Sequence, residues 1–178
     1  MPEKRTTILK GKNVTLLGPE ILVGQQAPDF SLVPPLNRVE LSLTTKNVTL
    51  SQSVGKVRLI SVVPSLDTPV CDMQTKSFEE IARDFTEVVF YTVSMDLPFA
   101  HARYDQSNDI RIMLTLSDYR EASFGLAYGV LIEKLHLHSR AVFIIDKDDT
   151  VRYVEYVPRI ANPPDFNNAI AAMKILIQ

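Results

Sequence analysis

Short apolar runs alternate with helix-type patterns through the central and C-terminal parts of the chain. Runs of this length are typical of strands that are buried on both faces. The sequence predicts such strands at Val57–Val63, Val88–Met95, Ile112–Ser117 and Ala141–Asp146, with a further strand at Thr150–Val157. The triplet Lys147-Asp148-Asp149 separates the last two strands, so we expect these two to form a hairpin.

Helical periodicity appears between and after these strands. In the segment Asp72–Phe85, apolar residues recur at the i, i+3, i+4, i+7 spacing that places them on one helical face. Pro98–Gln106 is compatible with a second helix, because proline suits the first helical turn. A C-terminal helix is predicted after Pro163-Pro164 from the apolar positions Phe166, Ile170, Met173 and Ile177.

The N-terminal part of the chain predicts a hairpin. Thr6–Leu9 and Asn13–Leu17 read as strands on either side of a turn at Gly11-Lys12. The segment Leu41–Leu50 alternates weakly and predicts another edge strand or hairpin arm. The sequence thus favours an α/β fold with a mixed central sheet and helices on both faces. We expect one domain over residues 1–178, with residues 1–20 forming the hairpin extension.

Composition narrows the range of functions. The chain has 178 residues, 46 % of them hydrophobic and 22 % charged, with a formal net charge of −2. No segment concentrates Lys or Arg without nearby acids, which argues against nucleic acids and anionic membrane surfaces as partners. No window holds 18 uninterrupted apolar residues, and the N-terminus lacks the apolar core of a signal peptide. We therefore expect a cytoplasmic protein without a membrane span.

Cys71 is the only cysteine, so the chain cannot form an internal disulfide. It ends the run Pro64–Cys71, which joins a predicted strand to a predicted helix. The first turn of a helix carries unpaired N–H groups and a partial positive charge, and both favour a thiolate over a thiol. The alternative is a cysteine that serves only as a small buried hydrophobe.

The neighbours of Cys71 favour the reactive interpretation. Thr68 lies three residues earlier, close enough for its hydroxyl to approach the sulfur, and Pro64 and Pro69 stiffen the intervening loop. Arg140 stands at the start of the predicted strand Ala141–Asp146, from which a guanidinium could reach the same loop. Alternatively, Thr68 caps the helix and Arg140 forms a surface ion pair.

Pro64, Thr68 and Cys71 match the Pro-x-x-x-Thr/Ser-x-x-Cys signature of the peroxiredoxins. Four segments in the right order resemble the thiol peroxidase subfamily: SVVPSLDTPVCDMQT, TVSMDLPFA, TLSDYREASFGLAYGVLI and RAVFIID. The resemblance implies a thioredoxin-like fold and a cysteine-based peroxidase that needs no metal or haem cofactor. It also suggests a homodimer.

Residue roles follow from the same resemblance. Cys71 would be the nucleophile that attacks H₂O₂ or an organic hydroperoxide and becomes a sulfenic acid. Thr68 would hydrogen-bond the sulfur and the peroxide, and Arg140 would hold the thiolate and polarise the O–O bond. Pro64 would shield the sulfur from water and from further oxidation.

The chain departs from the subfamily at Asp105, where LPFAHARYD has an aspartate in place of the expected resolving cysteine. Three routes then remain for the oxidised Cys71. An external thiol (thioredoxin, glutaredoxin or a small thiol) could reduce the sulfenic acid, two subunits could join through Cys71, or turnover could be lost. We expect a thiol-dependent peroxidase with a one-cysteine cycle. The alternatives are a redox sensor or binding module on the same fold, and a purely structural cysteine.

Histidines do not predict a metal centre. His136 and His138 would share a face if they lay on a strand, but His101 is the only other histidine. Because zinc needs three or four convergent ligands, we expect no metal site here.

Overall fold

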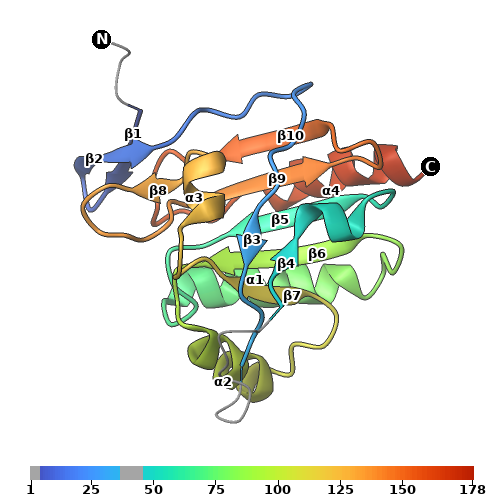
Figure 1. Cartoon of the computed structure of the whole chain (residues 1–178), viewed down its shortest axis with the longest axis horizontal. Helices are drawn as coiled ribbons and strands as arrows, with labels where there is room; N and C mark the ends of the chain where they lie inside the picture. Colours follow the sequence, from blue (N-terminus) through green and yellow to red (C-terminus); the bar gives the residue numbers. More distant parts are fainter. Residues whose placement is uncertain (1–4, 37–45) are drawn as a thin grey trace.

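The computed structural model describes residues 5–36 and 46–178, and it places a five-stranded sheet at the centre (Figure 1). The strand order across this sheet is β10-β9-β5-β6-β7. In chain order the strands are β5 (Arg58–Val62), β6 (Val89–Ser94), β7 (Leu114–Ser117), β9 (Ala141–Ile145) and β10 (Val151–Tyr156). All five predicted central strands are present, and the fifth pairs with the fourth as a hairpin.

Strand direction makes the sheet mixed. β5, β6 and β7 are parallel to one another, whereas β9 runs antiparallel to β5 and β10 runs antiparallel to β9. Parallel neighbours need crossover connections, and α1 (Pro69–Ala82) and α2 (Pro98–Asn108) supply them. The ends of β5, β6 and β7 and the start of β9 therefore share one edge of the sheet.

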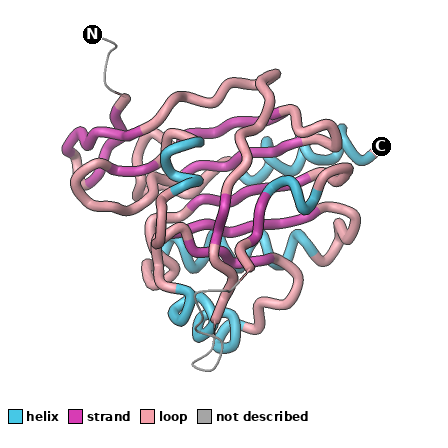
Figure 2. The backbone as a smooth tube through the Cα atoms, viewed as in Figure 1, coloured by secondary structure: helices cyan, strands magenta, loops and turns pink. Residues whose placement is uncertain are grey.

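Helices lie on both faces of the sheet (Figures 1 and 2). α1 and α4 (Phe166–Ile177) cover one face, and α2 contacts the outer strand β7. The short α3 (Ser123–Ala127), the 3₁₀ turn Leu50–Ser53 and the two-stranded sheet of β3 (Ser31–Leu32) and β4 (Val48–Thr49) cover the other face. The predicted α/β architecture is confirmed.

Side-chain alternation explains why the central strands read as continuous apolar runs. In β5, Ile60 and Val62 pack into the core beneath α3, whereas Leu59 packs into the core beneath α1 and α4. In β9, Phe143 and Ile144 divide between the two cores in the same way. Because both faces are covered, neither set of positions needs to be polar.

The N-terminal hairpin forms as predicted from β1 (Thr6–Leu9) and β2 (Lys12–Leu17). Its turn lies one residue earlier than expected, at Lys10-Gly11, and both residues have positive φ (48° and 76°). A two-residue turn of this kind matches strand twist and favours glycine. β2 also pairs with β8 (Leu131–Ile132), a two-residue strand too short to show any periodicity in the sequence.

Several predicted boundaries were wrong. α1 begins at Pro69 rather than Asp72, because proline suits the first helical position, and it ends at Ala82 rather than Phe85. β7 begins at Leu114 rather than Ile112, because the preceding backbone N–H groups, including that of Ile112, donate to the Glu79 carboxylate instead of to a strand.

One predicted strand lies partly outside the residues that the structure describes. Of the expected strand Leu41–Leu50, residues 41–45 lie outside the described residues; Val48–Thr49 forms β4 and Leu50 begins the 3₁₀ turn. Across the described part of the chain, no helix combines the length and apolar character needed to cross a membrane.

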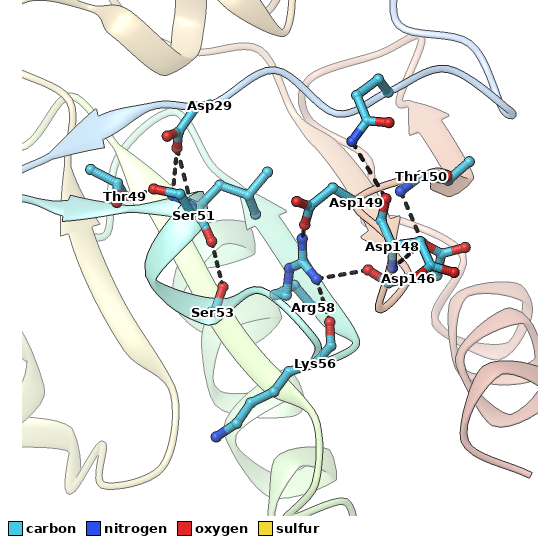
Figure 3. Close-up of polar contacts among 12 residues, drawn as sticks. Asp29, Thr49, Ser51, Ser53, Lys56, Arg58, Asp146, Asp148, Asp149 and Thr150 are labelled. Carbon is cyan, nitrogen blue, oxygen red and sulfur yellow. Dashed lines mark hydrogen bonds and ion pairs between the residues drawn. The ribbon is translucent and has the colours of Figure 1, made fainter.

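A buried arginine connects the start of β5 to the β9–β10 turn (Figure 3). The Arg58 guanidinium is fully buried and donates to the carbonyl oxygens of Lys56 and Asp146 and to the carboxylate of Asp149. Burial lowers the pKa of Arg58 because desolvation penalises its charged form. The Asp149 carboxylate is the direct ion-pair partner of this buried cation, and the nearby Asp146 carboxylate also favours its charged form.

Replacing Asp149 by Asn should lower the free energy of unfolding by about 2 kcal/mol, because the Arg58 cation loses its charged partner. Asparagine tolerates the left-handed backbone at this position, where φ is 60°. Urea unfolding at pH 7 measures the change. The control is Asp148→Asn at the neighbouring exposed side chain, which should change stability by less than about 0.5 kcal/mol. Equal effects of the two substitutions would contradict the role assigned to Asp149.

Candidate active site

The directions of the strands bring Cys71 and Arg140 to the same edge of the sheet. Cys71 lies in the first turn of α1, which follows the end of β5. Arg140 immediately precedes β9, which pairs antiparallel with β5 so that Ala141 faces Val62. The start of β9 therefore lies beside the end of β5, although the two residues are 69 positions apart in the sequence.

The Cys71 sulfur is fully buried and has two polar neighbours. The Thr68 hydroxyl lies 2.7 Å from Sγ, and the Arg140 Nη2 lies 3.4 Å from it. Both groups can donate hydrogen bonds to sulfur, and the guanidinium also carries a positive charge. The first-turn backbone N–H groups of α1 add to the same electrostatic environment. A hydrogen-bond donor and a positive charge are the kinds of neighbour that a thiolate requires.

Thr68 occupies the N-cap position of α1 without capping the helix through its side chain. The hydroxyl is directed to the Cys71 sulfur and to the Ser65 carbonyl oxygen, 3.1 Å away. The helix N-terminus instead has Pro69 at its first position, where a missing N–H group costs nothing. The capping alternative for this side chain is therefore wrong.

Arg140 is buried, at 2 % exposure, and each part of its guanidinium has a separate partner. Nε donates to the Ile160 carbonyl oxygen at 2.9 Å, Nη1 donates to the Gln74 amide oxygen at 2.6 Å, and Nη2 reaches the Cys71 sulfur. The surface ion-pair alternative is wrong for this residue. Three fixed contacts restrict the orientation of the guanidinium, so its approach to the sulfur is set by the fold.

Gln74 is a site residue that the sequence analysis missed. It is fully buried on α1, three positions after Cys71, which places both side chains on the same face of the helix. Its amide nitrogen donates to the Ser61 hydroxyl at 2.8 Å while its amide oxygen accepts from Arg140. The i, i+3 spacing was a usable signal, but an uncharged glutamine has no chemistry that singles it out.

Pro64 is buried at the beginning of the loop that connects β5 to α1. It lies next to Val63, which packs in the same core cluster as Cys71. Its fixed backbone φ restricts the path of the loop toward Thr68. The shielding role expected for Pro64 stays a prediction.

A cavity of about 440 Å³ opens to solvent at the N-terminal end of α1, and Cys71 is not among its lining residues. Thr68, Pro69, Asp72 and Tyr104 are among the residues that line it. The Tyr104 hydroxyl donates to the Asp72 carboxylate at 2.8 Å, and its pKa is raised, first by burial and then by this carboxylate. Thr68 is exposed, lines this cavity and contacts the buried Cys71 sulfur, so it is the residue that connects the cavity to the sulfur.

Asp105 lies on α2, where its carboxylate accepts two contacts from the Thr115 hydroxyl at 2.8 and 3.0 Å. Burial raises the pKa of Asp105 to about 6, and the nearby Glu79 carboxylate acts in the same direction. The position expected for a second cysteine thus holds a partly buried acid that is bonded to the sheet.

The two closely spaced histidines do not share a face. His138 is buried, and its Nε2 lies 3.0 Å from the Asp118 carboxylate. His136 is exposed and has a φ of 48°, which turns the chain between them. The strand geometry considered for them was therefore wrong. Among the described residues, no three His, Cys, Asp or Glu side chains converge as metal ligands.

The Asp105 carboxyl should make the fold less stable as the pH rises from about 4 to about 7. Its folded pKa of about 6 exceeds the ordinary value of 3.8, so the folded state binds the proton more tightly than the unfolded state. The stability that proton binding at Asp105 contributes is fully present below the pKa of this group in the unfolded chain. It is lost as the pH rises through the pKa of the group in the folded chain. Asp105→Asn should therefore gain about 1–2 kcal/mol relative to the original chain over this range. Urea unfolding at several pH values measures the difference.

Asp109→Asn is the matched control, because the Asp109 side chain is 68 % exposed just beyond the same helix. Its pH profile should follow that of the original chain. An Asp105→Asn profile parallel to the original would show that Asp105 titrates normally.

Comparisons with known proteins agree with the fold and with the family resemblance. Residues 23–154 match the model of the AhpC/TSA family. The thiol peroxidase of Halalkalibacterium halodurans is 50 % identical over 165 residues, covering 93 % of this chain and 95 % of that protein. The Bacillus subtilis thiol peroxidase is 45 % identical over 169 residues, covering 95 % of this chain and 96 % of that protein.

Solved structures extend the comparison to three dimensions. A peroxiredoxin-like protein from Aquifex aeolicus superposes with a TM-score of 0.86 at 39 % identity, covering 97 % of each chain. A thiol peroxidase from Chromobacterium violaceum gives 0.83 at 18 % identity, again over 97 % of each chain, and supports the fold alone. The chain therefore belongs to the AhpC/TSA family of peroxiredoxins, as an enzyme that reduces peroxides with electrons from a thiol.

Proposed function

We propose that Cys71 is the peroxidatic nucleophile of this enzyme and that it works in a one-cysteine cycle. The observation that carries this proposal is the placement of Sγ within reach of both the Thr68 hydroxyl and the Arg140 guanidinium, in a fully buried position. A sulfur that served only as a small hydrophobe would not need two polar donors, whereas a thiolate does.

The proposed reaction begins with attack of the Cys71 thiolate on the terminal oxygen of H₂O₂ or an organic hydroperoxide. The S–O bond forms as the O–O bond breaks, and the departing oxygen takes up a proton to leave as water or an alcohol. Sulfur is oxidised by two electrons to a sulfenic acid. The Arg140 guanidinium would stabilise charge on the departing oxygen, the Thr68 hydroxyl would orient the peroxide, and Pro64 would restrict water.

An external thiol completes the proposed cycle, because Cys71 is the only cysteine and Asp105 cannot form a disulfide. One thiol condenses with the sulfenic acid and releases water, which leaves a mixed disulfide on Cys71. A second thiol attacks this disulfide, releases the oxidised reductant and restores the Cys71 thiolate. Thioredoxin, glutaredoxin and small thiols are the candidate reductants. A disulfide between two Cys71 residues is disfavoured, because both buried sulfurs would have to leave their helices.

A reductant screen tests this cycle. H₂O₂ and an alkyl hydroperoxide are each supplied in excess with thioredoxin, glutaredoxin or a small thiol, and peroxide consumption is followed over time. The account predicts many turnovers per chain with at least one reductant and none above background for Cys71→Ser. Oxidation of Cys71 without turnover in any arm would reject the cycle. A sulfenic acid that persists and captures a specific protein would then favour the redox-sensor alternative.

We also propose that the enzyme acts in the cytoplasm, over the single domain 1–178, as a homodimer. Cytoplasmic thioredoxin and glutathione pools supply the external thiol that a one-cysteine cycle requires. The homodimer proposal is supported by the family resemblance and by two exposed apolar side chains at the start of α2, Leu97 at 53 % and Phe99 at 37 % exposure. They line the same cavity, beside Leu36 and Ala100.

Sedimentation velocity should find a particle of twice the mass of one chain. Leu97→Asp should shift it toward the monomer by placing a charge in the apolar contact, and aspartate at this N-cap position should leave α2 intact. Ile175→Asp is the control, because Ile175 is 72 % exposed on α4. A monomeric original chain, or equal shifts for the two variants, would contradict the dimer contact proposed here.

A further inference from the structure

Asp96 lies between β6 and α2, at the sheet edge that also presents Cys71. Its carboxylate crosses to the loop that connects β5 to α1. One oxygen accepts from the Ser65 hydroxyl at 2.8 Å, and the other accepts from the Leu66 backbone N–H at 2.7 Å. Hydrogen bonds to an ionised carboxylate are about twice as strong as neutral ones. A single side chain therefore fixes two consecutive residues of the loop.

The same loop residues set the position of Thr68. The Ser65 carbonyl oxygen accepts from the Thr68 backbone N–H at 3.2 Å, and it lies 3.1 Å from the Thr68 hydroxyl oxygen, which has a single proton to share between this carbonyl and the sulfur. The hydroxyl in turn lies 2.7 Å from the Cys71 sulfur. When the hydroxyl donates its proton to the sulfur, the backbone N–H of Thr68 still holds the residue to the Ser65 carbonyl, so Asp96 is linked through Ser65 to Thr68 and from there to the sulfur. A shift of Ser65 would move the Thr68 hydroxyl directly.

Asp96 is itself held from the side away from the loop. The Ser94 hydroxyl donates its proton to Asp96 at 2.7 Å, so the Ser94 oxygen must act as acceptor toward His101 Nε2, 3.0 Å away. This assigns the His101 proton to Nε2. His101 is fully buried, and burial lowers its pKa to about 4, which keeps the ring neutral near pH 7. The Ser117 hydroxyl also donates to the Asp96 carbonyl oxygen.

We propose that Asp96 is a positioning residue for the reaction at Cys71: it fixes Ser65 and Leu66 and thereby holds the Thr68 hydroxyl against the sulfur. The inference rests on the proposed roles of Cys71 and Thr68. In the sequence this aspartate stands within the segment TVSMDLPFA, where nothing marks it as a site residue. Asp96 has no contact with the sulfur, so its whole effect on the reaction passes through Thr68.

Asp96→Asn tests the proposal with little change of shape. An amide retains one oxygen acceptor but cannot accept from three donors with a full charge. The rate of Cys71 oxidation by H₂O₂ is measured by rapid quenching and intact-protein mass spectrometry. We expect a fall of about tenfold or more, because small misplacements of a reacting group produce losses of this size. An unchanged rate would overturn the proposal.

A double-mutant cycle with Thr68→Val separates positioning from a general structural role. If Asp96 acts through the Thr68 hydroxyl, Asp96→Asn should change the rate by less than about twofold once that hydroxyl is absent. The same tenfold fall in both backgrounds would show that Asp96 acts by another path and would overturn the proposal. Ser65→Ala, which removes one contact to Asp96 but keeps the Ser65 carbonyl, should slow the original chain less than Asp96→Asn does. It provides the test if the Asp96 variant fails to fold, and an unchanged rate for Ser65→Ala would then overturn the proposal.

Asp29→Asn is the matched control. The Asp29 carboxylate also accepts from two backbone N–H groups, those of Leu50 at 2.8 Å and Ser51 at 3.3 Å in the 3₁₀ turn, but it lies in the region around Arg58 (Figure 3). It should keep the oxidation rate within about twofold even if stability falls. A loss equal to that of Asp96→Asn would overturn the proposal. If the original chain did not react with H₂O₂, the proposed function would fail and this inference with it; normal reactivity in both the original chain and Asp96→Asn would reject this inference alone.

Discussion

The site depends on one constraint: a buried sulfur that is to carry negative charge must find its stabilising groups within the protein. Cys71 is fully buried, and the Thr68 hydroxyl and the Arg140 guanidinium replace the water that the sulfur has lost. Each donor must in turn be held in place. Gln74 and the Ile160 carbonyl orient the guanidinium, and the Ser65 carbonyl holds Thr68 through its backbone N–H. Polar groups around the sulfur are thus connected rather than isolated, which is the condition under which buried polar networks are stable.

The mixed sheet makes this convergence possible. Three parallel strands end at one edge of the sheet, and the antiparallel β9 begins at the same edge. This edge therefore brings together the loop before α1, the loop before α2 and the residue before β9. The opposite end of β5 contributes to the stability of the fold. There Arg58 binds the β9–β10 turn through the Asp146 carbonyl and the Asp149 carboxylate. Stability and chemistry are therefore placed at opposite ends of the same central strand, which allows each to be changed with limited effect on the other.

The apolar runs predicted the central strands because both faces of the sheet are covered, and helical periodicity predicted α1 and α4 because each buries one face. Neither pattern predicted β3 or β8, since a two-residue strand has no period. The Cys71, Thr68 and Arg140 set could be predicted from chemistry and family resemblance. Gln74 and Asp96 could not, because their importance comes from partners brought close only by folding. The possibility that His136 and His138 share a strand face was wrong for a related reason, because the positive φ at His136 turns the chain between them.

The central claim is that this environment turns an ordinary thiol into a fast nucleophile for peroxides. The most direct test is the second-order rate constant for oxidation of Cys71 by H₂O₂ at pH 7, compared with that of free cysteine under the same conditions. Because the removal of one well-placed donor typically costs a factor of about 10² to 10³, the account predicts that Cys71 reacts at least about 100-fold faster than free cysteine. A rate equal to that of free cysteine would contradict it and would leave Cys71 as a structural residue.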